Sequence, residues 1–213
     1  MSVKKRPVSP RQKMINLMYI VLMAMLALNV SSDVLKGFSL IGDSLKRTTG
    51  NAMKENAALY ADFESAYKAN PTKVKPWYDK AMEVKRMSDS LYTLAGDLRL
   101  AIAREADGKD ADPDILQNKE DLEGSNRIML APARGKGKQL YDAINNFRTR
   151  ILALVTDPRQ RAIIASNLST DVPKSEDNVG KNWQQYMFEE MPSIAAVTML
   201  AKLQSDVRKA ENE

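Results

Sequence analysis

The chain has 213 residues, with 32 lysines and arginines against 27 aspartates and glutamates, and it contains neither cysteine nor histidine. This composition excludes disulfides, thiolate nucleophiles, imidazole bases and Cys/His metal sites within the chain. Five basic residues precede the first carboxylate, Asp33, and the rest of the chain holds 27 residues of each sign. The net charge of +5 therefore belongs to the N-terminal flank, which is not how a nucleic-acid-binding surface distributes its charge.

Residues 1–13 form a basic segment, and residues 14–32 form an apolar one. The basic side chains are Lys4, Lys5, Arg6, Arg11 and Lys13. The apolar run reads MINLMYIVLMAMLALNVSS, and as an α-helix it would be about 28 Å long, close to the ~30 Å hydrocarbon thickness of a bilayer. Basic residues before an apolar span favour a cytoplasmic N-terminus. The sequence therefore predicts a cytoplasmic segment 1–13, a transmembrane helix 14–32 and a region 33–213 on the far side of the membrane. That side is the periplasm if the protein is bacterial, and a lumen or the exterior otherwise.

A cleaved signal peptide is the alternative interpretation of this N-terminus, because it also has a charged region followed by an apolar one. Val30-Ser31-Ser32 would serve as a cleavage site. The apolar run is longer than the usual apolar region of a signal peptide, which favours a retained anchor.

The predicted span has two distinct sides. At 100° per residue, one side carries Arg11, Met18, Leu22, Met25 and Asn29 within about 40° of one direction. The opposite side carries Asn16, Ile20, Ala24 and Ala27, and Ala27 and Ser31 have the spacing of small residues at helix contacts. We expect Asn16, Ala24, Ala27, Asn29 and Ser31 to take part in helix–helix packing in the membrane. Isolated amides and alanines are also tolerated in single spans, and that alternative stays open.

The rest of the chain is predicted to be helical. Apolar residues at helical spacing predict a helix over 34–69, a break at 70–76, and a second helix over 76–106 with Pro76 in its first turn. Residues 107–136 are the least regular stretch, with one short helix expected near 115–122. Further helices are expected at 138–156, 158–168, 182–190 and 192–209, with a loop at 169–181. This pattern predicts an all-α fold, an antiparallel helical bundle whose core contains Trp77, Phe147, Trp183 and Phe188.

Two short motifs resemble binding sites. Residues 133–138 (ARGKGK) are glycine-rich and basic, but they lack the spacing of a phosphate-binding loop and follow no predicted strand. Asp107, Asp110, Asp112 and Asp114 are clustered without the pattern of a calcium-binding loop, so a solvated loop is expected. We expect no catalytic residue, metal or cofactor and hence no enzyme, although chemistry based on carboxylates alone stays open.

Residues 9–38, SPRQKMINLMYIVLMAMLALNVSSDVLKGF, closely resemble the N-terminus of the GldM/PorM family. The resemblance is dense and nearly uninterrupted, and the helical region to Glu213 is similar to the first periplasmic domain of that family. It implies the inner-membrane motor subunit of the type IX secretion and gliding machinery, driven by the proton motive force. Family members continue into β-rich periplasmic domains that reach outer secretion components, so the chain is expected to be the N-terminal part of such a protein.

The resemblance also implies partners. Two copies of the chain, a homodimer, would place their transmembrane helices inside a ring of five two-span subunits of the GldL/PorL type, within the lipid bilayer. Because residues 1–32 contain no aspartate or glutamate, a proton-carrying carboxylate would have to belong to that partner. Arg11 cannot carry the proton but could pair with the carboxylate as a fixed cation, with Tyr19 and Lys13 as further contacts.

Several alternatives remain at this point. Arg11 and Lys13 could extend to the lipid headgroups as ordinary positive-inside residues, and Tyr19 could be a packing aromatic. The runner-up function is a membrane-anchored periplasmic sensor with a helical ligand-binding domain. The chain has no second apolar run of transmembrane length, which counts against a signalling receptor.

Overall fold

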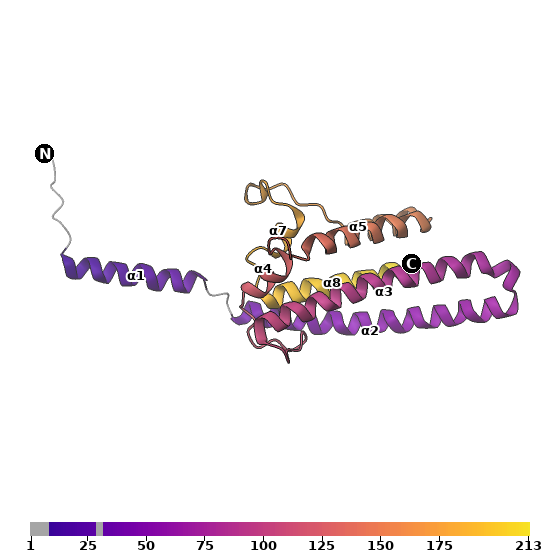
Figure 1. The fold of residues 1–213 in the computed structure, drawn as a ribbon, viewed down its shortest axis with the longest axis horizontal. Coiled ribbons are helices and arrows are strands. Elements are labelled where there is room, and N and C mark those ends of the chain that lie inside the picture. The colour runs from indigo at the N-terminus through magenta and orange to yellow at the C-terminus, as the bar shows by residue number, and fades with distance from the viewer. Residues whose placement is uncertain (1–8, 29–31) are drawn as a thin grey trace.

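The computed structural model describes residues 9–28 and 32–213, without the side chains of residues 24–28, and in these residues it contains helices and no strand (Figure 1). The helices, in chain order, are α1 (Pro10–Leu28), α2 (Ser32–Ala69), α3 (Pro71–Asp107), α4 (Glu123–Met129), α5 (Gly137–Leu154), α6 (Pro158–Asn167), the 3₁₀ turn η1 (Glu176–Asn178), α7 (Trp183–Phe188) and α8 (Ser193–Asn212). The predicted all-α class is confirmed.

The bundle is organised on a long antiparallel hairpin. Its arms are α2, with 38 residues, and α3, with 37, each about 55 Å long (Figure 1). The helix α1 lies apart from the hairpin and the other helices (Figure 1).

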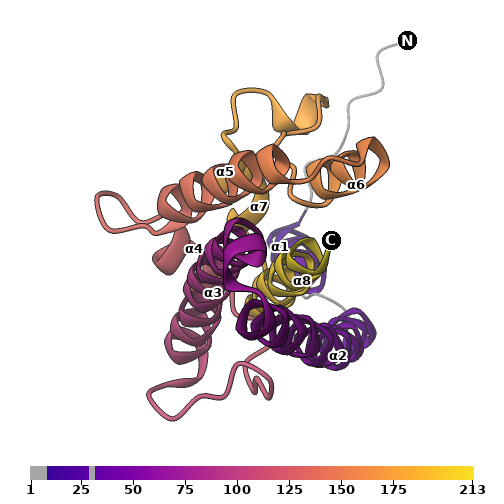
Figure 2. The same ribbon diagram turned by 90° about the vertical axis from the view of Figure 1, so that its right-hand side faces the viewer.

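Helix α8 packs against both arms of the hairpin (Figure 2). It runs parallel to α2, as two hydrogen bonds show. Near the start of α8 the hydroxyl of Thr198 donates to the carbonyl of Phe38, and near its end the backbone carbonyl of Arg208 accepts from the side-chain amide of Asn56. The prediction of an antiparallel bundle therefore holds for α2 and α3 but not for α2 and α8. With 20 residues, α8 covers about half of the hairpin, and the hairpin tip extends beyond its end (Figure 1).

Helices α4 and α5 pack against α3 on the side away from α2, while α7 contacts α4 and α5, and α6 contacts α5 and α8 (Figure 2). Their apolar residues join those of α3 and α8 in one core, in which Phe147, Trp183 and Phe188 are buried as predicted. Trp183 and Phe188 meet edge to face, with ring centroids 6.0 Å apart. Trp77 contradicts its prediction: it is 65% exposed, because it lies on the hairpin tip beyond the reach of α8.

Five predicted helices are confirmed with small shifts at their ends: α2, α5, α6, α7 and α8. The predicted start of α3 is wrong. This helix begins at Pro71, because the Asn70 side chain accepts a hydrogen bond from the backbone N–H of Lys73 (3.2 Å) and Pro71 fits the first turn. Pro76 therefore lies inside α3 rather than at its start.

The short helix predicted at 115–122 is also wrong. The Asp107 carboxylate accepts hydrogen bonds from two consecutive backbone N–H groups of this stretch, at 2.6 and 2.8 Å, and these bonds hold it in an irregular conformation. The helix α4 begins just after it, where the Asp121 carboxylate accepts from the backbone N–H of Gly124 (2.8 Å).

In the two described stretches, 9–28 and 32–213, no helix combines the length and the hydrophobicity that crossing a bilayer requires. Residues 29–31 of the predicted span 14–32 lie outside the described residues. The transmembrane helix therefore stays a prediction.

Candidate functional site

The candidate site is α1, the helix that carries the residues singled out in the sequence. Its start is defined by Ser9, whose side-chain oxygen accepts a hydrogen bond from the backbone N–H of Gln12 (3.3 Å), and by Pro10 in the first turn. No carboxylate stands in this first turn. Arg11 and Lys13 therefore place two cations at the positive end of the helix dipole without local compensation, which would favour an external anionic partner.

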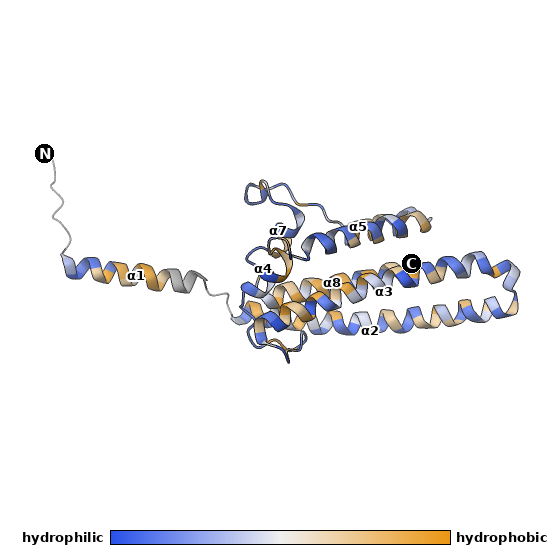
Figure 3. Ribbon diagram, viewed as in Figure 1, coloured by the Kyte–Doolittle hydropathy of each residue, from blue (hydrophilic) through white to orange (hydrophobic). Residues whose placement is uncertain are grey.

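The middle of α1 is apolar on all sides. Its large apolar side chains from Met14 to Met23 are each between 48% and 71% exposed. Figure 3 shows this hydrophobic band. Because successive residues advance by 100°, these nine positions are spread around the whole helix. A helix that is apolar all round is normally buried in protein or lipid, so α1 requires a surrounding that the chain does not itself supply.

The described site residues fall on opposite sides of α1. Arg11 and Met18 share one side, and Lys13 and Asn16 lie toward the other. All four are exposed. Asn16 accepts a hydrogen bond from the side chain of Gln12 within the same helix (3.2 Å). Its amide N–H groups have no such bond in the described residues and are available for a neighbouring helix.

Arg11 and Tyr19 lie on two levels of α1. Eight residues separate them, which corresponds to about 12 Å along the helix axis and about 80° around it. Each of them would therefore meet a partner at a different depth. Ala24 and Ala27 belong to α1 but their side chains are not described, and Asn29 and Ser31 lie outside the described residues.

A second polar site, which the sequence analysis missed, lies where α8 ends against the hairpin. This α8 polar cluster consists of Tyr60, Ser88, Asp89, Arg208 and Glu211. The Arg208 guanidinium donates to Asp89 at 2.8 Å and to Glu211 at 2.7 Å. The hydroxyl groups of Ser88 and Tyr60 donate to Glu211 at 2.7 and 2.9 Å. The cluster thus joins α8 to both α2 and α3.

The centre of the α8 polar cluster is buried, whereas the side chain of Asp89 at its edge is 43% exposed. The side chains of Arg208 and Glu211 are 8% and 2% exposed, and the guanidinium stacks 4.4 Å from the ring of Tyr92. Burial disfavours the charge on Arg208, but its hydrogen bonds with Glu211 and Asp89 outweigh this and raise its pKa above the ordinary value. Burial and the Glu211 carboxylate raise the pKa of Tyr60 above its ordinary 10.0, so the phenol stays neutral and donates its proton. A signal was present in the sequence, since Arg208 and Glu211 continue the three- and four-residue apolar spacing of α8.

The Asp89 carboxylate of this network predicts acid sensitivity. Burial alone would raise the pKa of Asp89, but hydrogen bonds from Lys85 and Arg208 outweigh it and lower the pKa below the ordinary 3.8. The stabilisation is therefore fully present above pH 3.8 and is lost as the pH falls through the lower value of the folded state.

We expect the free energy of unfolding of the chain, measured by denaturant titration at a series of pH values, to fall below pH 3.8. The variant Asp89→Asn should be less stable near neutral pH and should lose part of this dependence. An identical pH dependence in the variant and the wild type would contradict the assignment.

The loop that carries Asp107, Asp110, Asp112 and Asp114 is tied to the bundle through Asp114. Asp114 pairs with Lys46 on α2 at 2.6 Å and with Arg99 on α3 at 2.8 Å, and so ties the loop to both arms of the hairpin. In the described part of the chain there is no group of three or more acidic side chains able to hold a metal.

The glycine-rich turn at 133–138 is shaped by packing. A Cβ atom at Gly135 would lie 2.7 Å from the carbonyl oxygen of Met129, and one at Gly137 would lie 2.8 Å from the same atom. The close approach of the backbone between α4 and α5 therefore explains why these two positions are glycine.

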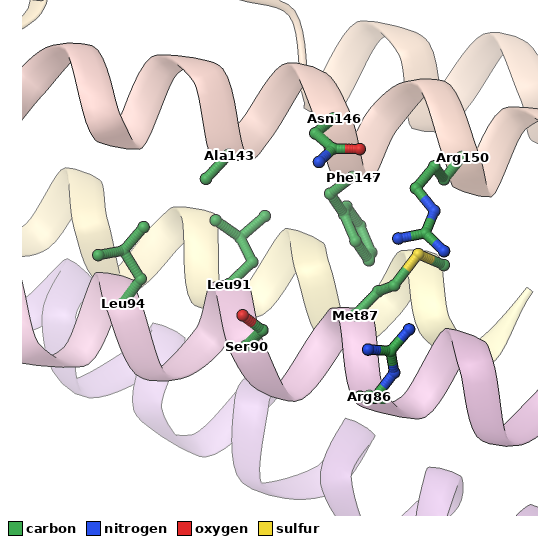
Figure 4. Close-up of a pocket in the computed structure, with 9 residues that line it drawn as sticks. All are labelled: Arg86, Met87, Ser90, Leu91, Leu94, Ala143, Asn146, Phe147 and Arg150. Carbon is green, nitrogen blue, oxygen red and sulfur yellow. The ribbon is translucent and has the colours of Figure 1, made fainter.

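One groove in the bundle lies between α3 and α5 (Figure 4). Its volume is about 250 Å³, with Leu94 and Ala143 at one end and the guanidinium groups of Arg86 and Arg150 at the other. Arg150 is paired with Glu83. The lining contains no carboxylate, hydroxyl–base pair or other arrangement suited to general acid–base or nucleophilic catalysis.

The family described as the GldM N-terminal domain matches residues 33–213, which is the bundle from α2 to α8. No curated protein matches the chain. Because the family match covers most of the sequence, the chain belongs to the GldM family and thereby to the gliding and type IX secretion machinery.

Proposed function

We propose that the chain is a non-enzymatic subunit of an inner-membrane motor driven by the proton motive force. In this proposal the segment 14–32 crosses the membrane, residues 1–13 lie in the cytoplasm, and the bundle lies in the periplasm. Two copies of the span sit inside a ring of five two-span partner subunits, and the bundle transmits the motion.

The observation that carries the proposal is the apolar circumference of α1. Its exposed side chains from Met14 to Met23 need lipid or other helices around them. The basic residues before it support a cytoplasmic N-terminus. The two sides of the helix suit two different neighbours. The side with Arg11 would face the partner ring, and the side with Asn16 would face a second copy of the chain.

The distribution of charge supports a proton-transfer scheme in which the titrating carboxylate belongs to the ring and the fixed cation belongs to this chain. No aspartate or glutamate precedes Asp33, so a titrating carboxylate in the membrane would belong to the ring. The guanidinium of Arg11 stays charged and can pair with that carboxylate in its ionised form. Protonation would weaken the pair and let the ring step past, and the membrane potential supplies about 2.3 kcal/mol per charge per 100 mV to bias the step.

The bundle is suited to transmit motion. Its hairpin arms are each about 55 Å long. Helix α8 holds them together through the hydrogen bonds of Glu211 with Tyr60 on α2 and Ser88 on α3 and the ion pair of Arg208 with Asp89. A rigid lever of this length would carry a rotation at the membrane to partners further out.

Native mass spectrometry tests the proposal. The chain is expressed with its two-span partner, extracted from membranes and measured as an intact complex. We expect two copies of the chain with five of the partner. A monomer or a simple homodimer without the partner would contradict a motor and favour the membrane-anchored sensor.

A further inference from the structure

A second pocket of the bundle lies between α5, α7, α8 and the loop that follows α6. Its volume is about 250 Å³. Helix α7 lies beside α5 at this place (Figure 2). The wall of the pocket includes Leu140 and Ile144 from α5, Trp183 from α7 and Leu200 from α8, all of them buried. The pocket is therefore an apolar hollow in the side of the bundle that α2 does not cover.

The rim of this pocket is held in place by hydrogen bonds within the bundle. The guanidinium of Arg148 on α5 donates to the carbonyl of Leu168 (3.2 Å), and the hydroxyl of Thr170 donates to the side-chain oxygen of Asn145 on α5 (3.0 Å). The loop after α6 is thus fixed against α5 without a ligand. Binding would therefore require little ordering of the protein.

The polar side chains of the lining favour a cation. Two carboxylates, Asp171 and Asp206, stand against one ammonium group, that of Lys202, so the lining carries one net negative charge. Tyr186, which is 37% exposed, belongs to the same lining. An aromatic ring together with carboxylates is a favourable environment for a positively charged group.

Asp206 is a buried carboxylate with unused binding capacity. Its side chain is only 9% exposed, and in the described residues its one hydrogen bond comes from Lys202, which donates to Oδ2 at 2.5 Å. Its Oδ1 atom has no donor there, although it is not sealed off from the surface. A group that enters the pocket can therefore give this oxygen a second charge-assisted hydrogen bond.

The size of the pocket suits one long side chain. Small-molecule sites usually enclose about 300–1,000 Å³, which is more than this pocket offers. Lysine and arginine combine an apolar stem with a cationic end, so the stem would pack on the apolar wall while the end reaches Asp206. The indole N–H of Trp183 donates to no acceptor in the described part of the chain and is not sealed off either. It is therefore available to a backbone carbonyl of a bound segment.

We propose that this pocket binds a lysine or arginine side chain that an extended segment of a partner protein presents. The cation would bind Asp206 beside Lys202, with Asp171 and Tyr186 at the rim. The site lies on α5, α7 and α8 rather than on α1, so this inference goes beyond the proposed motor and does not depend on it. It would give the bundle a docking point for a basic partner on its own side of the membrane.

Trp183 can report on the pocket directly. The chain has two tryptophans, and Trp77→Phe removes the one that is 65% exposed on the hairpin tip. The full chain with this change, solubilised in detergent, is titrated with the peptide acetyl-Ala-Arg-Ala-amide while the tryptophan fluorescence is measured. Acetyl-Ala-Glu-Ala-amide is the control peptide of opposite charge.

Three variants in this background separate the pocket from the rest of the surface. Asp206→Asn removes the charge that the proposal requires. Asp142→Asn is the matched control, because Asp142 also pairs with a lysine four residues before it, but its side chain is 57% exposed and lies outside the lining. Asp171→Asn changes an exposed residue of the rim, so it tests the pocket without a substitution in the core.

We expect a saturable change of the Trp183 emission with the arginine peptide and none with the glutamate peptide. Asp206→Asn should weaken the binding about tenfold, which is typical of a hydrogen bond to a charged group. Asp171→Asn should weaken it less, and Asp142→Asn should leave it unchanged.

The absence of a saturable change with the arginine peptide would overturn the proposal, as would equal binding of the glutamate peptide. Equal affinities of Asp206→Asn and Asp142→Asn would also overturn it. If circular dichroism shows that Asp206→Asn does not fold, Asp171→Asn decides, and an unchanged affinity in that variant would overturn the site.

Discussion

Replacing Arg208 by methionine is expected to lower the free energy of unfolding of the chain by about 3–5 kcal/mol. Methionine keeps an unbranched apolar stem but leaves the Glu211 carboxylate, with a side chain only 2% exposed, without its cation. A buried charge that has lost its partner costs far more than an exposed one. Denaturant titration of the detergent-solubilised protein, followed by far-ultraviolet circular dichroism, measures the change.

Arg127 provides the control for this prediction. It pairs with Glu105 and Glu123 at distances similar to those of Arg208, but its side chain is 63% exposed. Arg127→Met should therefore change the stability little. The double variant Arg208→Met with Glu211→Met should recover much of the loss, since no buried charge remains from that pair. Equal effects of Arg208→Met and Arg127→Met would show that the cluster is not what holds α8 in place.

The second large effect is expected at the other end of the chain. Arg11→Ala should abolish type IX secretion while the chain still assembles with its partner, because the fixed cation opposite the ring carboxylate is removed. Arg11→Lys should restore little, since an ammonium group keeps the charge but not the two parallel hydrogen bonds of a guanidinium. Secretion of a reporter protein and co-purification of the partner are measured together.

Lys13 is the matched control for Arg11. It lies in the same turn of α1 but about 160° around the helix, toward Asn16. Lys13→Ala should keep most of the secretion activity. Undiminished secretion in Arg11→Ala, or an equal loss in Lys13→Ala, would contradict this role. Arg11 and Lys13 would then be ordinary positively charged residues on the cytoplasmic side of the span.

The helical architecture could be predicted because it depends on local patterns. Apolar spacing located α2 and the body of α3, and the later helices α5 to α8 were also expected near their observed ranges. The structure adds that Asn182 caps α7 with a complete capping box. The start of α3 was missed because two local signals compete there. Pro76 can begin a helix, but so can Asn70 followed by Pro71, and the earlier pair prevails.

The way the helices pack together was not predictable in the same way. Periodicity shows that a helix has an apolar side but does not say which helix covers it. Trp77 lies on an apolar side of α3 and remains exposed, because α8 ends before reaching it. Arg208 and Glu211 resemble an ordinary surface pair at a spacing of three, and only the position of α8 between α2 and α3 buries them.

The central claim is that α1 lies among foreign helices. Photo-crosslinking in living cells tests it most directly, with a benzophenone amino acid placed at Met18, on the side of Arg11, or at Ile20, on the side of Asn16. The account predicts that position 18 crosslinks to the two-span partner and position 20 to a second copy of the chain. Adducts with lipid alone at both positions would contradict it.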